Sequence, residues 1–210
     1  MSALPKSDRL EIVKLEKVFQ GWNRVMKATA RHRKNDGTWS RLYEREVYSP
    51  NTAVAVLPYD PKLDCLVLIE QLRIPALLTG VPPLMIETVA GMVDRDAGNE
   101  EIARHELEEE AGLTAGALTR IADFLPSPGS NSARVILYYT QVDASQAGGW
   151  YGLEEEDEEV RAFTVEPEEA RALLTEGRIR NGVTIIALQW FLLNHKSLRS
   201  GVLPEGLPPS

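Results

Sequence analysis

A short segment near the middle of the chain contains three carboxylates that could act together. If residues 99–111 form a helix, Glu106, Glu109 and Glu110 fall within an arc of about 100°, whereas Glu108 points away from it. Like charges one helical turn apart repel each other, so this stripe gains from a cation that neutralises it. Carboxylate oxygens are ligands that Mg²⁺ and Mn²⁺ prefer, and several of them can hold two or more ions. A solvated acidic face fits the same helix geometry.

A second group of acids is the unbroken run from residue 154 to residue 159. It follows the glycine-rich stretch 148–153, which would allow it to move, and carboxylates in such a loop could take a proton from a nucleophile. A solvated, mobile segment is the alternative. The formal net charge is −8, but outside residues 100–110 and 154–159 the chain has 19 acids and 22 bases. The acidity is therefore local, and it argues against a nucleic-acid partner, because such proteins are usually basic.

Composition narrows the class of protein further. The chain has 210 residues, of which 43% are hydrophobic and 26% charged, as in ordinary globular domains. Cys65 is the only cysteine, so an intramolecular disulfide is excluded, and its apolar neighbours predict a buried thiol. No apolar stretch is long enough for a transmembrane helix, and the N-terminus lacks the apolar core of a signal peptide. We expect a soluble cytoplasmic protein without a membrane partner.

The elements that position these acids can be outlined from the pattern. Residues 10–19, 22–30 and 39–48 are strand-like, and Asn35-Asp36-Gly37 supplies a hairpin turn between the last two. Three strands cannot bury an apolar face alone, so they must pack on the rest of the chain or on a partner chain. We expect three regions: an N-terminal β-subdomain (1–50), a main domain (51–198) and a Pro/Gly-rich tail (199–210).

The main domain interleaves strands and helices. Asn99 can cap the carboxylate helix and Gly112 can end it. Pro167 suits the first position of a later helix. This order predicts an α/β or α+β fold with a mixed sheet. Strands are expected at 53–57, 66–69, 119–125, 134–142 and 160–165, and further helices at 167–176 and 184–197.

The segment that begins at Gly91 reads GMVDRDAGNEEIARHELEEEAGL and resembles the Nudix hydrolase signature, G-x5-E-x7-R-E-U-x-E-E-x-G-U, where U is aliphatic. Two positions depart from it, because Ala97 stands for the first Glu and His105 for the Arg. The matching positions are Gly91, Glu106, Leu107, Glu109, Glu110, Gly112 and Leu113. The resemblance implies a Nudix fold, with a mixed β-sheet between helices, and a metal site that cleaves a nucleoside diphosphate linked to another group.

Residues from about 10 to 198 resemble the bacterial ADP-ribose pyrophosphatase branch of this family. The likeness includes Pro128, which lies 15 residues past Leu113 at the position that marks ADP-ribose specificity. It implies Mg²⁺-dependent hydrolysis of ADP-ribose to AMP and ribose 5-phosphate by a homodimer that exchanges its N-terminal strands. The segments that carry it are Gln71-Leu72-Arg73, residues 87–91 (ETVAG), residues 124–129 (FLPSPG) and residues 183–190 (VTIIALQW).

The resemblance also implies roles for single residues. Glu106, Glu110 and the backbone carbonyl of Ala90 would ligate Mg²⁺ or Mn²⁺, two or more ions per site, with Glu109 assisting in binding and catalysis. Glu156 would be the general base, and Glu158 a neighbouring metal-linked acid. The residues expected to contact the nucleotide sugar are Trp22 on the adenine, and Arg45, Glu46 and Arg73 on the base and diphosphate. For Trp22 a place in the core is the alternative, and for Arg45 and Glu46 an exposed cross-strand pair.

Two other functions stay open at this point. An acidic residue follows the Ser-Pro-Gly loop in this branch, whereas Ala133 stands there in this chain, which favours another nucleotide sugar such as GDP-mannose. Ala97 and His105 leave room for a Nudix-fold binding or regulatory protein with little turnover. The retained acids Glu106, Glu109 and Glu110 argue against that last alternative.

Overall fold

The computed structural model describes residues 4–5, 7–93, 97–153 and 157–204. The chain divides into two units, Met1–Asn51 with Ser127–Ala133, and Thr52–Pro126 with Arg134–Ser210. The first unit contains one antiparallel sheet of three strands in the order β1-β2-β3. These strands are β1 (Leu10–Gln20), β2 (Arg24–His32) and β3 (Tyr43–Tyr48).

The second unit contains a sheet of eight strands in the order β10-β11-β5-β4-β9-β8, with β6 on β5 and β7 on β4. Only β4 and β9 of the described pairs run parallel, so the sheet is mixed. Its strands are β4 (Ala53–Asp60), β5 (Cys65–Leu72), β6 (Leu84–Glu87), β7 (Val89–Met92), β8 (Leu118–Phe124), β9 (Val135–Gln141), β10 (Gly149–Tyr151) and β11 (Val160–Val165). The helices are α1 (Ile74–Leu78), α2 (Asn99–Ala111), α3 (Pro167–Thr175) and α4 (Gly182–Arg199).

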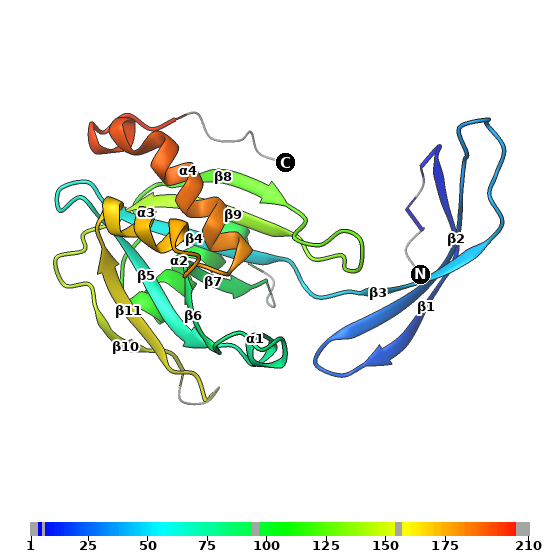
Figure 1. Ribbon diagram of the computed structural model, residues 1–210, viewed down its shortest axis with the longest axis horizontal. Helices are drawn as coiled ribbons and strands as arrows, with labels where there is room; N and C mark the ends of the chain where they lie inside the picture. Colours follow the sequence, from blue (N-terminus) through cyan, green and yellow to red (C-terminus); the bar gives the residue numbers. More distant parts are fainter. Residues whose placement is uncertain (1–3, 6, 94–96, 154–156, 205–210) are drawn as a thin grey trace. The chain divides into compact units, whose positions relative to one another are not determined.

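Helices cover both faces of this sheet (Figure 1). Successive residues of a strand point to opposite faces, so Val54 and Val56 of β4 pack in one core with α2, and Ala55 and Leu57 pack in another with α3 and α4. All four side chains are buried, which explains why β4 is a continuous apolar run. The predicted α+β class, with a mixed sheet between helices and an N-terminal antiparallel sheet, is confirmed.

The two central strands separate at one end of the sheet. β4 and β5 pair only at Tyr59↔Leu66 and Asp60↔Cys65, next to the turn that joins them. Farther on, β7 takes the edge of β4 and β6 takes the edge of β5. The segment from Glu87 to Gly91 therefore enters the sheet between its central strands, on the side where α2 packs against β7.

Several expectations need correction at the level of single residues. The N-cap of α2 is Gly98, and Asn99 is the first helical residue with no capping side chain before it. The last long helix begins at Gly182 rather than at Thr184, because the Asn181 side chain accepts a hydrogen bond from the Thr184 N–H (3.0 Å). Four short elements, α1, β6, β7 and β10, were not predicted. No helix among the described residues is long and apolar enough to cross a membrane.

Candidate active site

The carboxylate helix is fixed by its apolar side. Ala103, Leu107 and Ala111 are fully buried against the sheet, as their spacing predicts. Gly112 ends the helix in the left-handed conformation (φ 64°), and its N–H donates to the Glu108 carbonyl. The acidic residues are thereby held on a rigid element beside the sheet.

Glu106 lies against the backbone of β7. A Cβ atom added to Gly91 would lie 2.0 Å from the Glu106 Cδ atom and 2.1 Å from its Oε1 atom. Only glycine allows this approach, which accounts for the residue type that opens the signature. Strand β7 and helix α2 therefore place a backbone segment and a carboxylate in direct contact, and this arrangement suits a cation held by oxygen ligands.

Glu110 is the most deeply placed acid of the helix, with 3% of its surface exposed. It accepts a hydrogen bond from the Ala90 N–H (3.0 Å). Burial raises the pKa of its carboxyl to about 8, and the Ala90 hydrogen bond opposes that rise. The negative charges of Glu158 and Glu106 raise the pKa further, and the Arg73 guanidinium lowers it. The three carboxylates Glu110, Glu106 and Glu158 are oxygen ligands suited to a divalent cation, and Arg73 is a positive group close to Glu110.

Arg73 is held by a buried acid. Glu87 has 4% of its surface exposed, and its Oε2 atom accepts hydrogen bonds from Arg73 Nε (3.1 Å) and Nη2 (2.8 Å). Its Oε1 atom accepts from Asn181 Nδ2 (2.7 Å), and Asn181 also caps α4. The Gln71 amide, oriented so that both its atoms are satisfied, donates to Glu158 Oε1 (3.2 Å) and accepts from Arg73 Nη2 (2.8 Å). The guanidinium is therefore fixed by one carboxylate and one amide.

The acidic loop reaches this group of side chains at Glu158. A cavity of about 310 Å³ is lined by Arg73 and its two predecessors on one side and by residues 157–159 on the other. The turn before the loop needs glycine at Gly152 (φ 102°), because a Cβ there would lie 2.5 Å from the Glu158 carbonyl oxygen. Glu156, the predicted base, lies outside the described residues.

Comparison with known proteins identifies the family. Residues 49–186 match the NUDIX domain. The chain belongs to the Nudix family of hydrolases. It is 38% identical over 191 residues to an ADP-ribose pyrophosphatase of Escherichia coli (strain K12), covering 91% of each chain. It is 35% identical over 193 residues to an ADP-ribose pyrophosphatase of Haemophilus influenzae, covering 90% of this chain and 89% of the other.

A more distant relative and a solved structure complete the comparison. The chain is 34% identical over 161 residues to a GDP-mannose pyrophosphatase of Pectobacterium atrosepticum, covering 75% of this chain and 80% of the other. A crystal structure of an ADP compounds hydrolase has the same fold, with a TM-score of 0.67 and 22% identity, and the match covers 93% of this chain and 97% of that one. Nudix hydrolases generally need divalent cations, and the carboxylates Glu106, Glu109, Glu110 and Glu158 offer suitable ligands.

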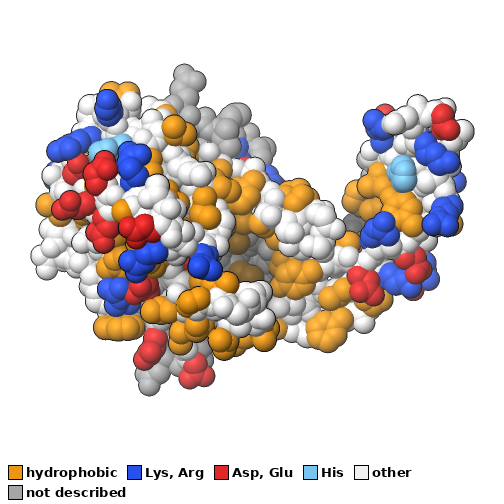
Figure 2. Space-filling model, in the orientation of Figure 1, with side chains coloured by type: hydrophobic (Ala, Val, Ile, Leu, Met, Phe, Trp, Pro, Cys, Tyr) orange, Lys and Arg blue, Asp and Glu red, His pale blue; other side chains and the backbone are white. Residues whose placement is uncertain are grey.

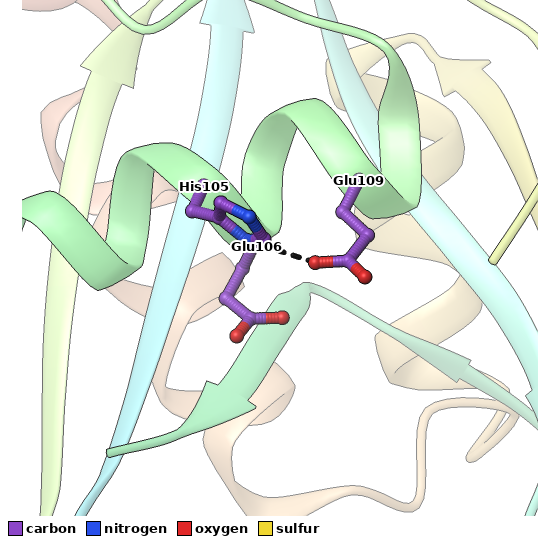
Figure 3. A group of neighbouring side chains, drawn as sticks. All are labelled: His105, Glu106 and Glu109. Atoms are coloured by element: carbon purple, nitrogen blue, oxygen red, sulfur yellow. Dashed lines mark ion pairs between the residues drawn. The ribbon is translucent and has the colours of Figure 1, made fainter. Parts of the chain in front are cut away.

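His105, which stands where the Nudix signature has arginine, contacts one of the acids of the signature. His105 Nδ1 lies 2.8 Å from Glu109 Oε2, one helical turn away (Figure 3). Ala97, the other departure, is partly buried and packs against the core on the α2 side of the sheet.

Three predicted substrate residues lie in the first unit. Trp22 is in the turn between β1 and β2 with 87% of its surface exposed, so the alternative of a core position is wrong. Arg45 and Glu46 are exposed on β3, and the Arg45 guanidinium lies 4.9 Å from the centre of the Tyr43 ring. As neighbours on one strand they point to opposite faces, so they do not form a cross-strand pair with each other. Their roles in binding stay predictions.

Two site residues were not predicted by sequence reasoning. Gln71 and Glu87 lie in segments that carried the family resemblance, yet neither was assigned a role. Both are buried polar residues, with 3% and 4% of their surface exposed. Their partner Arg73 was predicted, and the signal that would have identified them is a buried polar residue next to a charged one, which needs a hydrogen-bond partner.

Proposed function

We propose that this protein hydrolyses the diphosphate bond of ADP-ribose and releases AMP and ribose 5-phosphate, with Mg²⁺ or Mn²⁺ as the cation and two or more ions per site. The observation that carries the proposal is the convergence of Glu110, Glu106 and Glu158 with a fixed Arg73 beside a cavity of about 310 Å³. The relatives named ADP-ribose pyrophosphatase, which match over about nine tenths of the chain, support this choice of substrate.

Each group of the site has a physical task in this reaction. Glu106, Glu110 and the Ala90 carbonyl, assisted by Glu109, would hold the cation, which supplies positive charge to the diphosphate oxygens and acidifies a nearby water. Arg73, held by Glu87, presents a preoriented guanidinium to a phosphate. An acid of the loop takes the proton of the attacking water.

The loop offers two acids for that last step, Glu156 and Glu158. Glu158 accepts a hydrogen bond from Gln71, and its negative charge raises the pKa of Glu110. Both observations support a role near the metal. We therefore assign the base to Glu156. The variants Glu156→Gln and Glu158→Gln separate the two roles, because the base variant should lose kcat at unchanged cation affinity. Equal mild effects of both substitutions would contradict a single base.

A substrate panel tests the function directly. Purified protein with Mg²⁺ is given ADP-ribose, GDP-mannose, UDP-glucose or NADH, and the released monophosphate is measured. We expect the highest kcat/KM for ADP-ribose. GDP-mannose is the second candidate, because Ala133 replaces an acid and relatives of that name exist. Binding without turnover of any compound would refute the enzymatic proposal and favour a binding or regulatory role.

The first unit supports a second part of the proposal, that the protein is a homodimer joined by its N-terminal strands. Hydrophobic side chains are exposed on the surface of this unit (Figure 2). A small sheet with such a surface gains by covering it. Sedimentation should give the mass of a dimer, and an active monomer would contradict the exchange of strands. The exposed large hydrophobic residues of β1 are Leu10 (43%), Val13 (50%), Leu15 (40%), Val18 (50%) and Phe19 (57%).

A further inference from the structure

The metal-binding face of α2 carries a nitrogen donor. The Nδ1 atom of His105 lies 2.8 Å from Glu109 Oε2. One ligand atom each from His105, Glu106 and Glu109 can be chosen so that all three lie within 4.8 Å of one another. Figure 3 shows the three side chains projecting from neighbouring positions of the one helix. Ligands about 2.0–2.1 Å from a common ion are separated by roughly 3–4 Å, so this group has the size of a coordination shell.

The residue type at position 105 decides which ions such a group prefers. The Nudix signature has arginine there, and a guanidinium stays protonated and cannot ligate a cation. A neutral imidazole can ligate, and it suits Zn²⁺, Co²⁺ and related transition-metal ions, whereas Mg²⁺ prefers oxygen ligands. Compared with the arginine of the signature, His105 therefore lacks a fixed positive charge beside Glu109 and offers a ligand of a softer class.

The surroundings leave this donor available to an ion. The His105 side chain is 50% exposed. The Glu109 side chain is 16% exposed, so its neighbours restrict it more. The adjacent Arg104 does not take the place of the missing arginine, because its Nη1 atom donates to the carbonyls of Ala115 (2.9 Å) and Gly116 (2.8 Å). Glu106 is fixed on the other side by its contact with Gly91. Two of the three candidate ligands are therefore preoriented, and the third is accessible.

We propose that His105 is a metal ligand, and that with Glu109 and Glu106 it binds a transition-metal ion of the Co²⁺ and Zn²⁺ class more tightly than a Nudix helix of carboxylates alone would. This inference rests on the proposed function, because it takes Glu106 and Glu109 as the ligands of that same site. It adds a nitrogen ligand to the set and thereby changes the ion that the site selects. Glu109 and His105, one helical turn apart, have the i,i+4 spacing that helical zinc ligands use.

Metal binding without substrate tests the proposal. Metal-free protein is titrated with Co²⁺ and separately with Mg²⁺, and calorimetry gives the two affinities while the visible absorption of Co²⁺ reports its ligands. We expect His105→Gln and His105→Arg to weaken Co²⁺ binding at least about tenfold and to change the Co²⁺ spectrum. The Mg²⁺ affinity of His105→Gln should change no more than about twofold, because Mg²⁺ gains little from nitrogen.

A second histidine provides the control. His32 is exposed on β2 in the first unit, and the control variant His32→Gln should bind Co²⁺ with the affinity of the native protein. Equal Co²⁺ affinity of the native protein and of folded His105→Gln would overturn the proposal. Circular dichroism verifies that each variant is folded. If His105→Gln does not fold, His105→Arg, which carries the residue of the Nudix signature, is used in its place.

Should His105 bind Co²⁺ while no compound of the substrate panel is hydrolysed, the proposed function fails and this inference stands. If the native protein hydrolyses ADP-ribose but His105→Gln binds Co²⁺ as tightly as the native protein, the proposed function stands and this inference fails.

Discussion

The burial of Glu110 makes the metal-free protein sensitive to pH in a direction opposite to ordinary acid denaturation. Glu110 has 3% of its surface exposed, and the pKa of its carboxyl group is raised to about 8 from 4.5, first by burial and then by the charges of Glu158 and Glu106. Between these two pKa values the folded state keeps a proton that the unfolded state has released. Stability therefore falls as the pH rises through this interval, because the folded state binds more protons.

The size of the effect follows from the shift. Each unit of pKa difference corresponds to about 1.4 kcal/mol, so a change from 4.5 to about 8 lowers the free energy of unfolding by about 5 kcal/mol across the interval. Glu110→Gln removes the titration but keeps an oxygen that can accept the Ala90 N–H. We expect the metal-free variant to be more stable than the native protein above about pH 8, and the advantage to vanish below about pH 4.5.

Urea unfolding of the chelator-treated protein at about pH 5 and about pH 8.5 measures the effect. Glu108→Gln is the matched control, because Glu108 is an exposed acid on the same helix. A divalent cation added at high pH should restore stability to the native protein and much less to Glu110→Gln. If both proteins lose the same stability between the two pH values, Glu110 does not carry the effect and the reasoning from its burial is wrong. Activity of the variant should fall by orders of magnitude in kcat.

Three further substitutions test other contacts. Gly91→Ala places a Cβ atom 2.0 Å from the Glu106 carboxylate carbon, so activity should fall about 100-fold, whereas Gly98→Ala, with no heavy atom within 4 Å, should have little effect. Glu87→Gln leaves Arg73 without its carboxylate, and we expect kcat/KM to fall about tenfold and unfolding to become easier by about 1–3 kcal/mol. The control for Glu87→Gln is Glu168→Gln, which changes an exposed acid. Asp64→Asn should lower the free energy of unfolding by about 1–3 kcal/mol in urea at neutral pH.

The size of the effect of Asp64→Asn on the free energy of unfolding depends on pH. Burial raises the pKa of Asp64, but hydrogen bonds from Tyr59 (2.6 Å) and His195 (2.7 Å) outweigh it, and the net pKa is lowered. The charge of Arg199 acts in the same direction. The carboxylate therefore stabilises the fold above its unfolded pKa of 3.8 and loses this contribution as the pH falls through the lower folded value. The difference between native protein and Asp64→Asn should disappear in strong acid, and a constant difference would contradict the account.

Elements with strong local signals could be predicted from the sequence. The helix at 99–111 and the strand at 160–165 have the predicted bounds, because Gly112 adopts the left-handed conformation and each apolar pattern matches one period. The strands β6 and β7 have four residues each, too few to show a period, and they exist because β4 and β5 separate and leave their edges to be paired. Such an insertion depends on tertiary pairing and has no local signature.

The same distinction holds within the candidate site. The acids of α2 could be predicted because helical spacing alone places them on one side. Helical spacing does not tell them apart, however, and their environments differ: Glu110 is buried, Glu106 contacts Gly91 and Glu109 pairs with His105. The support of Arg73 by Glu87 could not be predicted, because it requires β6 to lie beside β5 so that residues fourteen positions apart meet.

This arrangement of charge links cation binding to the stability of the site. In the metal-free protein the charges of Glu106 and Glu158 repel the ionised carboxylate of Glu110, and Arg73, a positive group that acts on Glu110, is already shared with Glu87. The repulsion is tolerated because α2 is anchored by its fully buried apolar face on the opposite side. A ligand that binds only the folded state stabilises it in proportion to the logarithm of its concentration above its Kd. A divalent cation in this site therefore completes the local structure as well as the chemistry, and the residue at position 105 decides which cation does so most strongly.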